Sequence, residues 1–411
     1  MTPLMTPQQV KTESETQDIT LPPGAPKAKK RWLLRTGEFI ILLILAVLVL
    51  ETFFKFAGIG EQEFLQPDKQ LGSKHIPGKL VTWRMEGYSH DKLSSSGLRD
   101  SEHQISKSPG VRRIALLGDS STEGMQVPLN ETYGKVVERL LNEGGQKYEV
   151  INFACSGYST GQQLLQYERD VRQYHPDIVL LLYNRGDSVE NIFTPGPTVL
   201  SQPRPYFYLD ANNQLQMDPS VLEACSSKLK PHPFWDYLKE NSRIYGVISA
   251  TGLVLSINEH NYRKWMGWLT NLTNAFVKND RPSTWTVPYA KQNPDNVTEA
   301  LLTRINKEIT ADGGKFALII FPNVVQDPDL QRQQSLFELL AHRQNFAFLD
   351  LTRPFFDADF HSYFLEYHFS SRGHAFVAQQ LEPLIEKLSA RHDLDATQNG
   401  EAPVNQQDRR N

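Results

Sequence analysis

The sequence contains little cysteine and little excess charge of either sign. Cys155 and Cys225 are its only cysteines, which excludes a disulfide-dense scaffold and a cysteine-rich zinc site. The formal net charge is −4 over 411 residues, so the composition does not favour a nucleic-acid partner. The sequence has neither a metal-ligand spacing nor a glycine-rich phosphate loop. We therefore expect no metal and no cofactor, and two cysteines that either form one disulfide or remain buried thiols.

An apolar segment lies near the N-terminus. Residues 1–31 are polar, end in a basic cluster, and are expected to be a disordered cytoplasmic segment. The uninterrupted apolar run Phe39–Leu50 is shorter than the roughly 20 residues that span a bilayer, but flanking aromatic residues and leucines extend it to 32–58. This favours a transmembrane signal-anchor, with a cleaved signal peptide and a buried soluble helix as the alternatives. The positive-inside rule then places everything after residue 58 outside the cytoplasm.

After the apolar segment, the pattern of apolar and polar residues changes at residue 111. Residues 59–110 are mixed in composition and are expected to be a linker and an irregular lead-in. Short apolar strands then alternate with amphipathic helices through 111–392, which predicts an α/β domain with a parallel sheet and helices on both faces. Residues 192–300 interrupt this alternation and predict an inserted cap that includes a small hairpin. The polar residues 393–411 are expected to be a disordered tail.

Polar residues follow several of the expected strands and converge on one edge of the sheet. Ser120 follows the first strand, Gly157 the second and Asn184 the third, while His368 follows the last strand and precedes the closing helix. Ligands of parallel sheets bind at the carboxyl ends of the strands. Serine is also a common cap at the start of a helix, so Ser120 by itself does not establish a nucleophile.

Four blocks of sequence give a more specific indication. They are "RIALLGDSSTEG", "INFACSGYSTGQQLLQY", "PDIVLLLYNRGDSVEN" and "EYHFSSRGHAFVA", in this order along the chain. The sequence thereby resembles the SGNH/GDSL hydrolase superfamily. The lead-in "SGLRDSEH" and the later "RPYFYLD" are similar to membrane-anchored bacterial members. The resemblance implies a three-layer α/β/α fold of the SGNH-hydrolase (flavodoxin-like) type. It also implies that Ser120 is the nucleophile, that His368 is the general base, and that Ser120 and Gly157 donate backbone N–H groups to the oxyanion.

Two positions depart from the family pattern. The third block usually supplies an asparagine to the oxyanion hole, and Gly186 occupies that position here. Asn184 is the expected substitute if the loop is reshaped, and Arg185 is the alternative donor.

The family often places an aspartate three residues before the histidine, where this chain has Leu365. Glu366, two residues before the histidine, is therefore the expected catalytic acid, with Asp359 and Asp357 as alternatives.

The expected function is that of a membrane-anchored extracytoplasmic serine esterase. The resemblance suggests a bacterial inner membrane, with the catalytic domain on the periplasmic side. The substrates would be esters, including O-acetyl groups on glycans or lipids, cleaved through an acyl-serine intermediate. An acyltransferase on the same fold and a non-catalytic relative that binds a glycan or a partner are the alternatives. The missing third-block asparagine favours the non-catalytic relative, and the Ser120–His368 pair opposes it.

Overall fold

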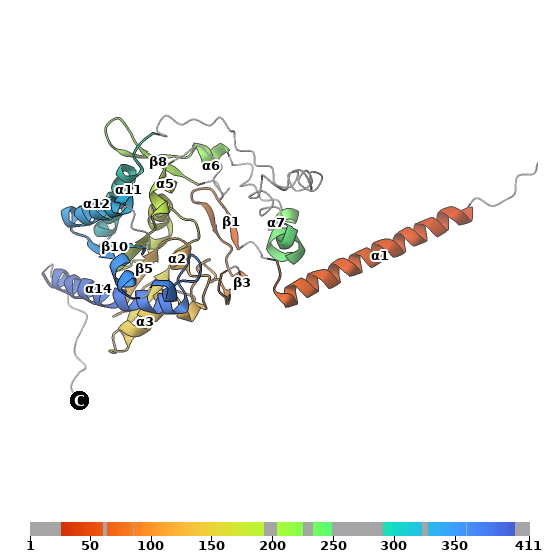
Figure 1. Ribbon diagram of the computed structural model, residues 1–411, viewed down its shortest axis with the longest axis horizontal. Coiled ribbons are helices and arrows are strands. Elements are labelled where there is room, and N and C mark those ends of the chain that lie inside the picture. Colours follow the sequence, from red (N-terminus) through yellow and green to blue (C-terminus); the bar gives the residue numbers. More distant parts are fainter. Residues whose placement is uncertain are drawn as a thin grey trace, which may run out of the picture. The chain divides into compact units, whose positions relative to one another are not determined.

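The structure is a computed structural model that describes residues 26–60, 64–84, 86–192, 204–224, 233–248, 291–322, 328–358 and 360–398. The chain divides into two units, and the first ends at Ala57. Its described part is the helix α1 (Pro26–Ala57), which starts earlier than the expected boundary at residue 32 (Figure 1). The stretch Leu34–Ala57 is long and apolar enough to cross a membrane. By the same test it also fits a signal sequence.

The second unit is built on a parallel five-stranded sheet (Figure 1). Its strands are β5 (Arg112–Leu117), β6 (Tyr148–Asn152), β7 (Ile178–Tyr183), β10 (Lys315–Ile320) and β11 (Ala347–Asp350), in the spatial order β11-β10-β7-β5-β6. The chain leaves β5 for β6 on one side and then passes to β7 on the other. Ligands of open parallel sheets bind at such a reversal, outside the carboxyl ends of the strands. This topology makes the ends of β5 and β7 the expected position of a site.

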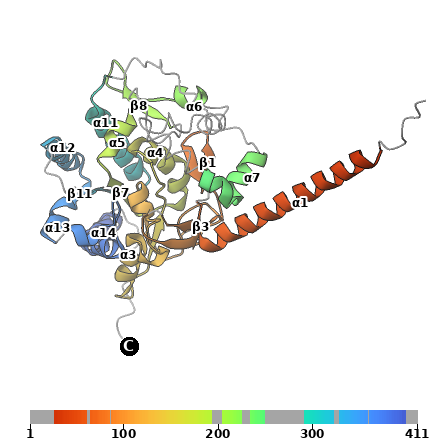
Figure 2. The same cartoon turned by 45° about the vertical axis from the view of Figure 1, so that its right-hand side comes forward.

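Helices cover both faces of the sheet. One face packs against α3 (Tyr133–Asn142), α13 (Thr352–Asp357) and α14 (Ser371–Gln398). The other packs against α4 (Thr160–Gln166), α11 (Pro294–Ala311) and α12 (Pro328–Gln344). The helices α3 and α14 lie side by side in both views (Figures 1 and 2). The predicted three-layer α/β/α fold is confirmed.

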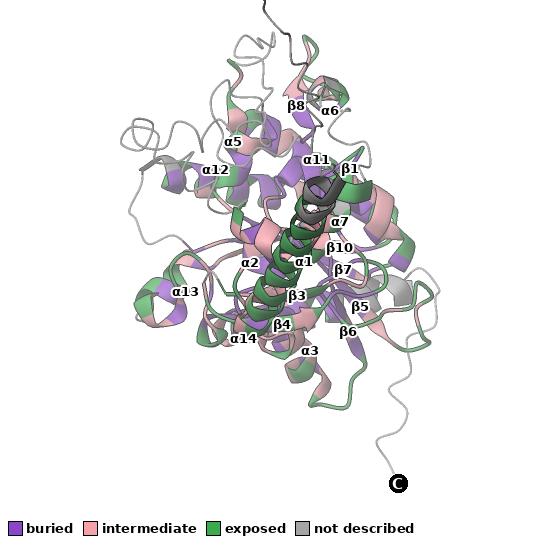
Figure 3. Cartoon of the chain, turned by 90° about the vertical axis from the view of Figure 1, so that its right-hand side faces the viewer, coloured by how far each residue is buried: buried purple, intermediate pink, exposed green. Residues whose placement is uncertain are grey.

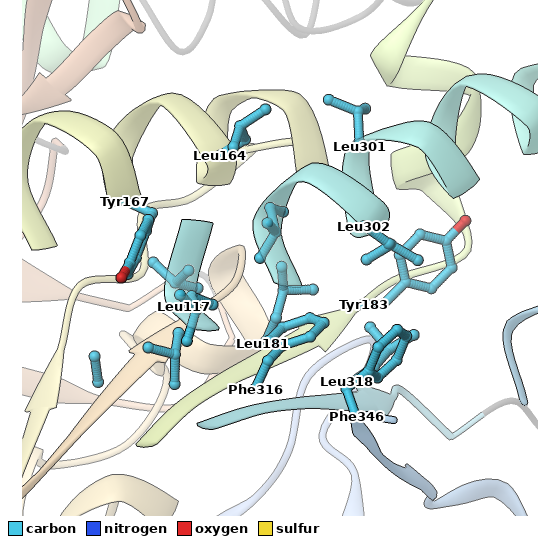
Figure 4. Packing of buried hydrophobic residues seen from close by; sticks show 14 of the residues in the cluster. Leu117, Leu164, Tyr167, Leu181, Tyr183, Leu301, Leu302, Phe316, Leu318 and Phe346 are labelled. Carbon is cyan, nitrogen blue, oxygen red and sulfur yellow. The ribbon is translucent and has the colours of Figure 1, made fainter. Parts of the chain in front are cut away.

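The core follows from strands that are apolar on both faces. Ile114 and Leu117 of β5 are fully buried and point to opposite faces, because successive strand side chains alternate. Figure 3 shows the sheet strands as buried and α1 as exposed. In Figure 4, Leu117 and Leu181 of neighbouring strands lie below Leu301 and Leu302 of α11. Apolar runs of this kind are typical of parallel sheets covered on both faces, which is why the sequence predicted the sheet.

Residues 64–92 differ from the expected linker and irregular lead-in. They form two antiparallel hairpins, β1 (Leu65–Asp68) with β2 (Gly72–His75) and β3 (Leu80–Trp83) with β4 (Ser89–Lys92). Four-residue strands with many polar side chains carry too little alternation to be recognised from sequence.

Buried charges attach the residues after β4 to the domain. Asp100 is 2% exposed, and its carboxylate accepts the backbone N–H of Asn152 at 2.8 Å and pairs with Lys135 Nζ at 2.6 Å. The Arg99 guanidinium donates to the carbonyl oxygen of Val127 at 2.6 Å. Removing one partner of a buried ion pair leaves the other charge uncompensated, which strongly destabilises the fold. The segment is therefore part of the domain rather than a linker to it.

The structure describes three parts of the expected inserted cap at 192–300, namely 204–224, 233–248 and 291–300. They include the predicted hairpin, formed by β8 (Tyr206–Leu209) and β9 (Leu215–Asp218), and the helices α6 (Ser220–Ala224) and α7 (Pro233–Asn241).

Two further expectations concern the cysteines and the C-terminal tail. Cys225 lies outside the described residues, so the two alternatives for the cysteines, one disulfide or buried thiols, stay open. The helix α14 continues to Gln398, beyond the expected boundary at residue 392.

His374 of α14 links the stability of the domain to pH. Its Nδ1 accepts the backbone N–H of Tyr133 at 3.1 Å, and the two rings are stacked. Burial lowers the pKa of His374 from 6.5 to about 3, and the nearby Arg99 guanidinium acts in the same direction. The unfolded state therefore binds more protons between these two pH values, so the free energy of unfolding falls as the pH falls through this window.

We expect His374→Asn to weaken this pH dependence, because the Asn Oδ1 accepts the same N–H and does not titrate. Between pH 7 and pH 5 the wild type should lose about 2 kcal/mol more stability than the variant. Chemical denaturation at both pH values measures this difference. Equal losses in the two proteins would contradict the prediction.

Candidate active site

Ser120 lies at the start of the four-residue helix α2 (Ser120–Glu123), which is separated from the end of β5 by Gly118 and Asp119. Asp119 is the N-cap of α2, and its side chain accepts the backbone N–H of Ser121 at 2.9 Å. Gly118 permits the tight turn, since a Cβ there would lie 2.1 Å from Thr122 Oγ1. Because Asp119 caps the helix, the Ser120 hydroxyl is left for another partner.

That partner is His368. The Ser120 Oγ and His368 Nε2 are 2.8 Å apart, although the residues are separated by 248 positions in sequence. His368 lies in a short loop before α14, in which its carbonyl oxygen accepts the N–H of Leu365 at 2.8 Å. The structure thus brings together the serine and the histidine that the sequence analysis selected.

The carboxylate on the other side of the imidazole belongs to Glu86. Its Oε2 lies 2.6 Å from His368 Nδ1, and its Oε1 accepts the backbone N–H groups of Tyr367 and His368. Partial burial by itself raises the pKa of Glu86, but the hydrogen bonds from Tyr367 and His368 outweigh it and hold the pKa below its usual value. Glu86 is therefore an ionised acceptor for the imidazole.

The expectation that Glu366 contacts His368 is not met. Glu366 is exposed and lies on the cavity wall, and the carboxylate on the imidazole is that of Glu86. Asp357, the alternative, ends α13 and lies near Arg353 with an exposed side chain. Asp359 lies outside the described residues.

Sequence reasoning missed Glu86 because it lies between two four-residue strands, β3 and β4, 282 positions before the histidine. The glycine next to Glu86 has a local feature that is related to its position. Gly87 has φ 74°, and a Cβ there would lie 2.1 Å from the carbonyl oxygen of Gln126. The backbone therefore passes close to the segment after α2, and a single sequence does not reveal this approach.

The expected oxyanion donors lie around the same cavity. It measures about 570 Å³, and its lining includes Ser120, Gly157, Asn184 and His368. Asn184 Nδ2 donates to Asp119 Oδ2 at 3.2 Å, so the displaced asparagine reaches the residue next to Ser120. Burial raises the pKa of Asp119, and hydrogen bonds from Ser121 and Asn184 partly oppose this rise.

Gly186, in the usual asparagine position, is the first residue of α5 (Gly186–Asn191). A Cβ on Gly186 would meet no atom within 4 Å, so a side chain has room there. The alternative donor Arg185 precedes Gly186 and lines a neighbouring cavity of about 460 Å³ that shares Asn184 with the first.

One group of side chains among the described residues has donor atoms suited to a metal ion. His75, Glu123 and Cys155 place one donor atom each within 4.8 Å of one another, and all three residues are buried. Hydrogen bonds already join Glu123 to His75 and to Ser156. Glu123 is the last residue of α2, so this group is attached to the helix that Ser120 begins.

Comparisons with known proteins agree with the sequence blocks. Residues 116–200 match the family model of the GDSL-like lipase/acylhydrolase family. An arylesterase of Vibrio mimicus is 32% identical over 82 residues, which cover 20% of this chain and 41% of that protein. The match thus spans about two fifths of the relative's length. The segment 116–200 that matches the family model contains Ser120, Gly157 and Asn184.

Two solved structures are also similar to this chain. TesA has a TM-score of 0.38 at 10% identity, over 67% of this chain and 99% of TesA. The psychrotrophic esterase EstA from Pseudoalteromonas has a TM-score of 0.37 at 13% identity, over 67% of this chain and 97% of that one.

We expect Glu86→Gln to slow the reaction of Ser120 with a fluorophosphonate probe by about 10³-fold. A glutamine neither stabilises the imidazolium nor favours the tautomer that accepts the serine proton. Glu366→Gln is the matched control, with the same change of side chain on the same cavity, and should stay within about threefold of the wild type. Labelling rates measured at fixed probe concentration test both variants. A larger loss in Glu366→Gln would restore the sequence-based assignment of the acid.

Proposed function

We propose, from the match of residues 116–200 to the GDSL-like lipase/acylhydrolase family model, that this chain is a serine esterase that acts through an acyl-serine intermediate. The observation that carries the proposal is the hydrogen-bonded series from Ser120 Oγ to His368 Nε2 and from His368 Nδ1 to Glu86. A nucleophile, a base and a group that orients the base are the parts that this chemistry requires.

The mechanism begins with attack of Ser120 Oγ on the ester carbonyl carbon, while His368 Nε2 takes the hydroxyl proton. Glu86 stabilises the imidazolium that forms, because its carboxylate stays ionised and fixed by two backbone N–H groups. Collapse of the tetrahedral intermediate expels the alcohol, which receives the proton from His368. Water then attacks the acyl-serine with His368 as base, and releases the carboxylic acid and free Ser120.

Three donors are proposed for the oxyanion: the backbone N–H groups of Ser120 and Gly157, and the side-chain amide of Asn184. The contact between Asn184 Nδ2 and Asp119 supports the last assignment, because it holds the amide beside the nucleophile turn. A primary amide has two hydrogens, so one can bind Asp119 while the second is available to the oxyanion. Such donors contribute most where charge develops in the transition state.

We further propose that the enzyme is anchored in a membrane and acts outside the cytoplasm. The apolar stretch Leu34–Ala57 supports an anchor, and the basic residues before it support a cytoplasmic N-terminus. A bacterial inner membrane with the domain on its periplasmic side fits this orientation. Ester substrates there include O-acetyl groups of glycans or lipids.

Ser120→Ala tests the proposed chemistry. We expect the wild type to hydrolyse p-nitrophenyl acetate and to be labelled by a fluorophosphonate, and the variant to do neither above background. Labelling with very slow hydrolysis, and acyl transfer when a sugar alcohol is added, would instead support an acyltransferase. A wild type that neither hydrolyses nor labels would favour a binding protein on a hydrolase fold and contradict the proposal.

The role of Asn184 is tested by a pair of substitutions. Asn184→Ala should lower kcat by about 10²–10³ with little change in KM, as loss of one oxyanion donor does. Gly186 has room for a side chain, so adding Gly186→Asn to Asn184→Ala should recover part of the loss. Steady-state kinetics of the three variants measure this. An unchanged kcat in Asn184→Ala would remove Asn184 from the proposed oxyanion hole.

A further inference from the structure

Gly157 lies in a tight turn that is hydrogen-bonded to Gly118, the residue after β5. Residues 155–158 form a β-turn that is closed by the hydrogen bond from Tyr158 N to Cys155 O at 3.1 Å. Ser156 and Gly157 are its two central residues, and Gly157 has φ 76°. A positive φ at the third residue is typical of a type II turn and favours glycine there. The Cys155 N–H donates to the carbonyl oxygen of Gly118 at 3.3 Å, close to the nucleophile.

The type of this turn decides the direction of the Gly157 N–H. Types I and II differ in the orientation of their central peptide, because ψ of the second residue changes by about 150° and φ of the third by about 170°. Here that peptide joins Ser156 to Gly157. Its rotation would reverse the Gly157 N–H with little movement of the ends of the turn. An amide that faces Ser120 in one turn type thus faces away in the other.

Glu123 of α2 binds the side chain of Ser156, which is next to this peptide. Its Oε2 accepts the Ser156 hydroxyl, and its Oε1 contacts Nε2 of His75 from β2. The opposite nitrogen of His75, Nδ1, lies 2.9 Å from the carbonyl oxygen of Gly97. Glu123 is fully buried and His75 is 5% exposed, so neither side chain can turn to water if a contact is lost.

We propose that Glu123 is a positioning residue for the oxyanion hole. Through the Ser156 hydroxyl it keeps the turn at 155–158 in its type II form, in which the Gly157 N–H faces the reacting carbonyl oxygen at Ser120. The inference rests on the proposed esterase function. Glu123 comes three residues after Ser120 in the same short helix, so one element fixes both the nucleophile and the turn that completes the hole.

Kinetics of Ser156→Ala, Gly157→Ala and the double variant test the inference. Ser156→Ala should lower kcat for p-nitrophenyl acetate about tenfold with KM within twofold, because the turn is less strongly held. The pH midpoint of kcat/KM should not move, since His368 and Glu86 are untouched. Gly157→Ala disfavours the positive φ and should lower kcat by about 10²–10³. The double variant should be no slower than Gly157→Ala, because the amide is already turned away.

Tyr167→Phe is the control for loss of a hydroxyl from a buried residue. It removes a hydrogen bond of 2.8 Å to Asp312, away from the catalytic cavity, and should keep the wild-type kcat. A wild-type kcat in Ser156→Ala would overturn the inference. Independent, multiplying losses in the double variant would overturn it as well, because the two residues would then act separately.

A crystal structure of Ser156→Ala tests the turn apart from activity. We expect φ of Gly157 to become negative in all or part of the molecules. A Gly157 φ that stays near the 76° of the wild type, at full occupancy, would overturn the inference. This readout remains decisive even if the wild type neither hydrolyses esters nor is labelled at Ser120, an outcome that would contradict the proposed function alone.

Discussion

The contact between Glu86 and His368 is the constraint on which the rest of the site depends. One carboxylate accepts two backbone N–H groups with one oxygen and lies 2.6 Å from the imidazole with the other. A carboxylate held by several donors stays ionised and has little freedom to turn. The imidazole is thereby fixed at Nδ1, and its Nε2 is left for Ser120. Residues separated by 282 positions must therefore be folded together before His368 is held against Ser120.

This dependence explains why the residues before the sheet are held by buried charges. Glu86 lies between β3 and β4, in hairpins too short to be stable alone. Arg99 and Asp100 fasten the chain after β4, and His75 fastens β2 to Glu123 of α2. Each of these contacts is made to α2 or to β6. The hairpins are thus positioned by the elements that carry Ser120 and Gly157.

The sequence predicted the parts of this arrangement that depend on local pattern. Buried strands such as β5 and β7 read as apolar runs, and parallel order places Ser120, Gly157 and Asn184 at one edge. It did not predict Glu86, because the four-residue strands β3 and β4 are too short to show a clear periodicity and the contact is tertiary. It also left open whether Ser120 caps its helix. The structure answers this through Asp119, which caps α2 and frees the serine hydroxyl.

Asp119 and Glu123, which lie on either side of Ser120 in the sequence, have parallel roles in the proposed mechanism. Asp119 accepts a hydrogen bond from the Asn184 amide, and Glu123 accepts one from the Ser156 hydroxyl beside Gly157. Each carboxylate thus constrains one of the proposed oxyanion donors. Gly186 provides no side chain at the usual asparagine position. The side-chain amide in the proposed oxyanion hole therefore comes from Asn184, directly after β7. In the proposed mechanism, the turn that carries Ser120 therefore also orients the proposed donors around it, and Asn184 takes the part of the asparagine that Gly186 replaces.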